Sequence, residues 1–111
     1  MSEITISINN IRPSDSPSRS SWERSRNVTS SYRATLYLVA GHYMAADGNH
    51  RIARLYQRHG GNLQLNASVE EMTDPLDVRG FLKQIKDIQD MGIYSYGDFL
   101  SMCVAGNFDR D

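Results

Sequence analysis

Cysteine and long hydrophobic runs are the features that this sequence most clearly lacks. The one cysteine, Cys103, cannot form an internal disulfide and cannot supply a multi-cysteine zinc cage. No apolar run approaches the roughly 20 residues that span a bilayer. The opening segment MSEITISINN also lacks the basic start and apolar centre of a signal peptide. We therefore expect a cytoplasmic protein with no disulfide framework, no zinc finger and no membrane partner.

The remaining composition is that of an ordinary soluble domain. The chain has 111 residues, of which 40% are hydrophobic and 23% are charged. A chain of this size buries about two-thirds of its unfolded surface on folding, so its core needs no cross-links. We expect a single domain over residues 1–111.

Lysine is scarce, and the charges are divided unevenly along the chain. Residues 12–58 hold eight arginines and three acidic residues, a net charge of +5, whereas residues 59–111 have a net charge of −5. Guanidinium groups grip phosphate or carboxylate oxygens in pairs, so the arginine-rich part suits a small anionic ligand. The same arginines can instead pair with the acidic part. Charge alone leaves both interpretations open.

Alternation and chain breakers predict strands and one long loop in the first part of the sequence. The isoleucines of residues 4–8 alternate with polar residues, as in a half-buried strand. Residues 12–31 are rich in serine and arginine and have no apolar period, which predicts a loop with one helical turn near Trp22. Such a loop is either a lid over a ligand or a mobile arm. The apolar run 34–40 predicts a central strand, and Gly41 predicts a hairpin turn.

A helix and a further strand follow. Residues 52–59 place apolar side chains at helical spacing, and Gly60 marks the end of this helix. A second face of the helix is basic, with arginines at spacings of three and four: Arg51, Arg54 and Arg58. Residues 62–69 alternate strictly between polar and apolar, which predicts a strand that covers the core on one side.

Residues 74–106 predict a pair of C-terminal helices. Asp74 and Pro75 are typical of a helix start. The apolar stripe of this helix is expected to contain Leu76, Val78, Phe81, Leu82, Ile85 and Ile88. Ser95 is expected to cap the last helix, and Gly106 to end it. The whole order predicts an α+β fold: a small mixed sheet, one helix between strands and two helices at the end.

The segment Asp47-Gly48-Asn49-His50-Arg51 carries the strongest chemical signal. The predicted strand before it and the predicted helix after it place it at a helix start, where unsatisfied N–H groups and the helix dipole favour a phosphate. Gly48 lets the backbone approach closely, and Arg51 can add a charged fork. Asp47 can cap the helix, or it can hold a ribose hydroxyl or metal-bound water. His50 can donate to a phosphate or act as an acid or base.

A plainer interpretation of this segment is also open. In it, Asp47 is only an N-cap, His50 a packed histidine and Arg51 a surface residue. A histidine metal site is not expected, because His50 and His59 begin and end one helix and lie about 13 Å apart at 1.5 Å per residue.

The segment GHYMAADGNHRIARLYQRHGG, followed by NLQLNASVEE, resembles the core of the ParB/sulfiredoxin superfamily. The shared signature is a strand with Gly-x-Tyr, then Asp-Gly-x-His-Arg opening a helix, then a glycine turn and another strand. The earlier ITISINNIRPSD resembles the first strand of that superfamily and the loop after it. The resemblance implies that the turn binds the phosphates of a nucleotide. The residues it implies as contacts are Gly48, Asn49, His50 and Arg51, and the basic helix face adds Arg54.

Departures from the superfamily bear on which activity to expect. Sulfiredoxins have a catalytic cysteine just before the His-Arg pair, and Asn49 stands there, which disfavours sulfinic acid reduction. Cys103 is more typical of a small core residue. Partition ParB proteins need DNA-binding and dimerisation domains, for which this chain has no room.

We therefore expect a stand-alone ParB-like domain that binds ATP, ADP or CTP, with or without Mg²⁺, at the turn from Asp47 to Arg51. His50 and Asp47 are the candidates for phosphohydrolase or phosphotransferase chemistry. One alternative is a non-catalytic interaction or inhibitory module whose partner protein contacts the acidic C-terminal helices. Another is a DNA-associated plasmid or phage accessory protein, although the charge of these helices does not favour DNA.

Overall fold

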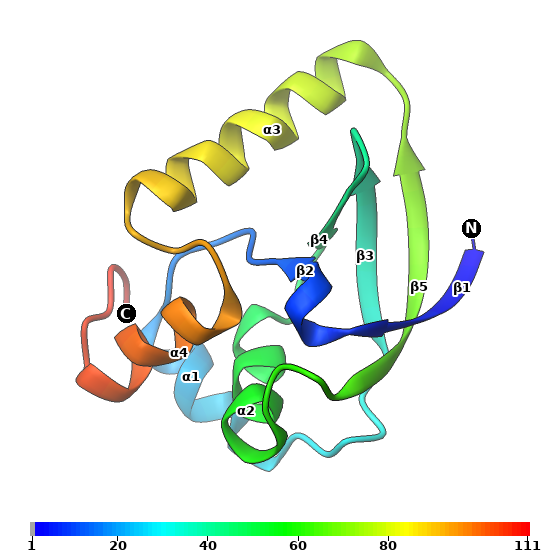
Figure 1. Ribbon diagram of the computed structural model, residues 1–111. Coiled ribbons are helices and arrows are strands. Elements are labelled where there is room, and N and C mark those ends of the chain that lie inside the picture. The colour runs from blue at the N-terminus through cyan, green and yellow to red at the C-terminus, as the bar shows by residue number, and fades with distance from the viewer. Residues whose placement is uncertain (1) are drawn as a thin grey trace.

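The computed structural model describes residues 2–111 and confirms the predicted α+β class. Within these residues, five strands form one mixed sheet accompanied by four α-helices, the last two of which follow the final strand (Figure 1). The strands are β1 (Ser2–Ser7), β2 (Ile11–Arg12), β3 (Ala34–Val39), β4 (His42–Ala45) and β5 (Gln64–Met72). The helices are α1 (Arg19–Arg24), α2 (Asn49–His59), α3 (Pro75–Asp90) and α4 (Tyr96–Ala105).

The sheet has the order β1-β5-β3-β4-β2, and it curls so that its two edges converge. β1 pairs antiparallel with β5, β5 parallel with β3, β3 antiparallel with β4, and β4 parallel with β2. Only the short 3-10 helix Ile8–Asn10 joins β1 to β2, although these strands lie at opposite edges. Three residues span at most about 10 Å. The edges must therefore approach each other at this end, as the course of the chain in Figure 1 shows.

The core lies between the concave side of the sheet and the packed pair α2 and α4. The predicted alternation of β5 is confirmed, because Leu65, Ala67 and Val69 are buried in this core. From α4, Tyr96 and Phe99 are fully buried against it. These two aromatic rings bring α4 close to the start of α2, where the segment predicted to bind an anion lies.

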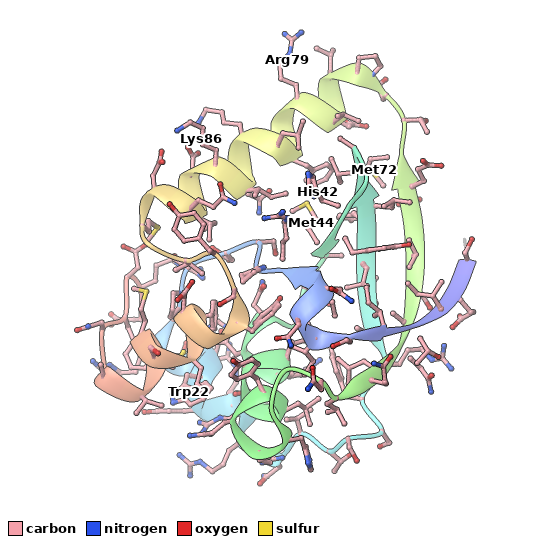
Figure 2. All side chains as sticks on the ribbon, viewed as in Figure 1. Trp22, His42, Met44, Met72, Arg79 and Lys86 are labelled. Atoms are coloured by element: carbon pink, nitrogen blue, oxygen red, sulfur yellow. The ribbon has the colours of Figure 1, made fainter. Side chains whose placement is uncertain are left out.

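Helix α3 covers part of the opposite side of the sheet. Its Ile85 packs in a small second cluster with Val39 and Met44, and Figure 2 shows Met44 between β4 and this helix. The apolar stripe predicted for α3 includes two residues that the fold leaves exposed: Leu76 is 74% exposed and Leu82 is 38% exposed. At about 100° per residue, Leu76 lies opposite Ile85, so one flat contact cannot bury both.

The segment 12–31 is a packed arm that contains α1 and a 3-10 turn at Ser25–Asn27. The predicted helical turn near Trp22 is therefore confirmed. Ser14, Ser16 and Ser18 are each only 4% exposed. The C-terminal residues lie against this arm, where the Arg19 N–H donates to the Arg110 carbonyl at 3.0 Å. Within residues 2–111, no helix is both long enough and apolar enough to cross a membrane.

Candidate functional site

The predicted turn joins the end of β4 to the start of α2, and Gly48 is required there for two reasons. Gly48 is the N-cap of α2 and has a φ of 77°, in the left-handed region that favours glycine. A Cβ at this position would lie 2.0 Å from the Tyr32 hydroxyl oxygen. A larger residue would therefore both strain the backbone and displace Tyr32.

The N-terminus of α2 is uncapped, unlike those of the other three α-helices in residues 2–111. Ser18 caps α1, Asp74 caps α3 as predicted, and Ser95 caps α4, each by accepting a backbone N–H in the first turn. No side chain caps α2, so the Asp47 carboxylate does not act as its cap. Within the described residues, the N–H groups of Asn49, His50 and Arg51 have no acceptor. The first turn of α2 thus presents free donors at the positive end of the helix dipole.

Asn49 is a structural link between three parts of the fold. It is 6% exposed, and its Oδ1 accepts from the Ser14 N–H at 3.1 Å and from the Tyr96 hydroxyl at 2.8 Å. Its Nδ2 donates to Ser14 Oγ at 3.0 Å. Burial keeps the pKa of Tyr96 well above its ordinary value, so the hydroxyl retains the proton that it donates. The side chain of Asn49 therefore holds the arm and α4 against the turn.

His50 is buried, with 9% exposure, and is held from two sides. Its Nε2 accepts from the Ser18 N–H at 2.9 Å, and its ring meets that of Phe99 edge-on with 5.0 Å between centroids. Burial, aided by the positive charge of Arg110, lowers the pKa of His50 to about 4. The ring is therefore neutral near pH 7, and because Nε2 accepts, the proton is on Nδ1.

Two small clefts meet at the turn and share Ser21, Asp47, Gly48 and His50. The first, of about 250 Å³, adds Arg24 from the arm and Arg51 from α2. The second, of about 270 Å³, adds Arg110 from the C-terminal segment. Asp47, which directly precedes Gly48 in the chain, lines both clefts and places a carboxylate in each. Burial and the nearby Asp47 carboxylate raise the pKa of Tyr32, whose ring lies 5.7 Å from the Arg51 guanidinium.

Arg54 and Arg58 hold the arm in place. Arg54 stacks on Trp22 with 3.3 Å to the ring centroid, and it donates to the Trp22 carbonyl at 2.7 Å and to Ser25 Oγ at 3.2 Å. Arg58 donates to the carbonyls of Arg26 and Val28. The structure thus places Arg54, predicted to bind a nucleotide, against the arm, where its guanidinium already has partners.

The arginines of residues 12–58 do not pair with the acidic second part of the chain in the described structure. Their one ion pair joins Arg33 to Glu3, and most of the others contact carbonyls, hydroxyls or aromatic rings, or line clefts. Asp87 and Asp90 of α3 instead pair with Lys83 and Lys86 of the same helix. The acidic face expected on the C-terminal helices is therefore partly neutralised within α3.

Sequence reasoning missed Tyr32, Ser21 and Arg110 as neighbours of the turn. Arg110 is about sixty positions from Gly48 in the chain, and no local pattern connects the two. Within residues 2–111, no group of three or more His, Cys, Asp or Glu side chains is placed to hold a metal ion.

Cys103 is 3% exposed in α4, and burial raises the pKa of its thiol to about 11. Because only the thiolate is nucleophilic, we expect the folded protein to react with a thiol reagent at pH 8 at least tenfold more slowly than the urea-unfolded chain. The measurement is the time course of alkylation in each state. Equal rates would show that the thiol is accessible in the folded protein.

Comparison with solved structures shows the same fold in another protein. The crystal structure of protein Atu1540 from Agrobacterium tumefaciens is similar to this chain, with a TM-score of 0.53 and 13% sequence identity. The similarity covers 84% of this chain and 50% of the Atu1540 chain, so this chain spans about half the length of that protein. At this identity the likeness shows the fold alone. No family model and no curated protein matches the sequence.

Proposed function

We propose that this chain is a ParB/sulfiredoxin-like domain that binds the phosphates of a nucleotide at the first turn of α2. The observation that carries the proposal is the uncapped N-terminus of this helix, where the N–H groups of Asn49, His50 and Arg51 have no acceptor in the described residues. Backbone donors at the positive end of a helix are the usual protein ligands of phosphate. The other three α-helices in residues 2–111 have side-chain caps, so among the α-helices this free turn is specific to α2.

The side chains around the turn complement a phosphate. Arg24 and Arg51 line the same cleft and supply two guanidinium forks. The Nδ1–H of His50 has no hydrogen-bond partner in the described residues, and Nδ1 is not fully buried. In this proposal it donates to a ligand in the clefts that His50 lines. Being neutral, His50 serves in this proposal as a hydrogen-bond donor rather than as an acid.

Asp47 would repel a bare phosphate, and this favours a nucleotide that carries Mg²⁺. The described residues offer no three-ligand metal site, so the ion would be held by Asp47 together with phosphate oxygens. Mg²⁺ would neutralise phosphate charge and orient the terminal phosphate. In this proposal the side chains of Asn49 and Arg54 have positioning roles: Asn49 holds the arm and α4 against the turn, and Arg54 fixes the arm that carries Arg24. The backbone N–H of Asn49 is one of the donors to the phosphate.

The test is thermal unfolding with ATP, ADP and CTP, each with and without Mg²⁺. A ligand at a hundredfold excess over its Kd stabilises the native state by about 2.7 kcal/mol, so one nucleotide should raise the Tm clearly. Arg51→Ala should remove this rise because it removes a phosphate fork while leaving the buried core intact. The matched control is Arg79→Ala, since Figure 2 shows Arg79 pointing from α3 away from the rest of the molecule.

Each outcome of this experiment either supports or refutes nucleotide binding at the turn. A rise in wild type and Arg79→Ala but not in Arg51→Ala supports the proposal. Equal loss in both variants indicates unspecific attraction between charges, and no rise with any nucleotide refutes the proposal. The last outcome would favour the alternative of a non-catalytic interaction module.

A further inference from the structure

A further cavity lies away from the turn. It has a volume of about 650 Å³ and opens where the two edges of the curled sheet converge. β1, the 3-10 helix Ile8–Asn10, β2 and the start of β4 all contribute to its wall. It shares no lining residue with either cleft at the turn. Its volume is within the range of 300–1,000 Å³ that is typical of small-molecule sites.

Isoleucine and tyrosine side chains form part of the cavity wall, and the polar side chains of Thr5, Asn9, Asn10 and His42 form the rest together with Arg12. Ile6 and Ile11 are buried, Ile4 is half-buried, and all three line the cavity from β1 and β2. Tyr43 from β4 and the exposed Tyr94 from the α3–α4 connection complete the aromatic part. The isoleucines and tyrosines give a flat ligand body an apolar surface to lie against, and the polar side chains can form hydrogen bonds at its edge.

One cation without a partner lies in this wall. Arg12 is half-buried, and in residues 2–111 its guanidinium forms no ion pair and donates no hydrogen bond. By contrast, Arg33, Arg54 and Arg110 each donate to a carboxylate, hydroxyl or carbonyl. No Asp or Glu lines the cavity. A partly desolvated, unpaired guanidinium gains strongly from an anionic partner, which it binds through two parallel hydrogen bonds.

We propose that this cavity is a second binding site, whose ligand is a small organic carboxylate with a planar apolar body. The body lies against the isoleucines and tyrosines, and the carboxylate is held by Arg12. A monocarboxylate fits better than a phosphate group because the wall supplies one fixed positive charge and includes no uncapped α-helix start. This site is independent of nucleotide binding at the turn.

Benzoate is the test ligand, and benzamide is its uncharged analogue. Titration of the ¹⁵N-labelled full chain with benzoate should shift the amide signals of Ile6, Arg12 and Tyr43, with no comparable change at Gly48 and Arg51. Benzamide has nearly the same shape but lacks the charge, so it should bind about tenfold more weakly or worse. Arg12→Gln should weaken benzoate binding by a similar factor, while Arg79→Gln leaves it unchanged.

The outcomes separate this site from the turn. Saturable shifts at the cavity that depend on charge and on Arg12 support the proposal. Equal binding of benzoate and benzamide, an unaffected Arg12→Gln, or no shifts at millimolar benzoate would each overturn it. Shifts centred on Gly48 that vanish in Arg51→Ala would assign benzoate to the phosphate site instead. The thermal unfolding of Arg12→Gln without ligand checks that this variant is folded.

Discussion

Replacing Asn49 with alanine should lower the free energy of unfolding by about 2–5 kcal/mol. The change leaves the buried Ser14 N–H without its acceptor and removes the acceptor of the Tyr96 hydroxyl. Each buried polar group left unsatisfied costs about 1–3 kcal/mol. Chemical denaturation, with fluorescence or circular dichroism as the signal, measures the loss directly.

Asn66→Ala is the matched control because it makes the same substitution at an exposed asparagine of β5. It should change stability by about 0.5 kcal/mol or less. Tyr96→Phe provides a second check: in this background Asn49→Ala should cost less than in wild type, because one of the broken hydrogen bonds is already absent. If Asn49→Ala unfolds like wild type yet abolishes nucleotide binding, its side chain is a ligand contact and the structural role assigned above is wrong.

The difference between these two roles of Asn49 shows where sequence reasoning reaches its limit. Patterns within a few residues predicted local structure well: the alternation in β5, the cap at Ser95 and the stop at Gly60 are all present. Each depends on backbone geometry within one element, so the relevant atoms are neighbours in the chain. The α+β class followed from the order of these elements.

The surroundings of the site residues depend on contacts between distant parts of the chain, and no local sequence pattern encodes such contacts. The partners of Asn49 and His50 are Ser14, Ser18, Tyr96 and Phe99, which are more than thirty positions away. The resemblance suggested that Asn49 faces a ligand, and the basic helix face suggested the same of Arg54. The side chains of both residues are instead occupied by the arm and, for Asn49, by α4. The donors that carry the proposed phosphate site belong to the backbone of the first turn, which sequence motifs describe only through the glycine that shapes the turn.

The packing of His50 has a consequence that sequence alone does not predict: stability should fall as the pH is lowered through the range between 6.5 and 4. In the unfolded chain the imidazole has its ordinary pKa near 6.5, whereas in the folded protein burial and Arg110 lower the pKa of His50 to about 4, against an opposing contribution from Asp15. Between these values the unfolded state binds the proton more tightly, so protonation favours unfolding. The stabilising contribution of neutral His50 is complete above pH 6.5 and is lost as the pH falls through 4.

At about 1.36 kcal/mol per pKa unit, the loss between pH 7 and pH 4.5 should be about 2–3 kcal/mol. His50→Gln isolates this effect, because glutamine does not titrate and its side-chain oxygen can still accept from the Ser18 N–H. Denaturation at a series of pH values should give wild type the steeper decline. The difference in stability between the two proteins should change between about pH 6.5 and pH 4 and be constant below pH 4, and carboxylates common to both cancel in that difference. Parallel curves would mean that His50 is protonated as easily in the folded protein as in the unfolded chain. When the ring is protonated, Nε2 carries a hydrogen and can no longer accept from the Ser18 N–H, whereas Nδ1–H remains a donor to the phosphate site as part of a cation.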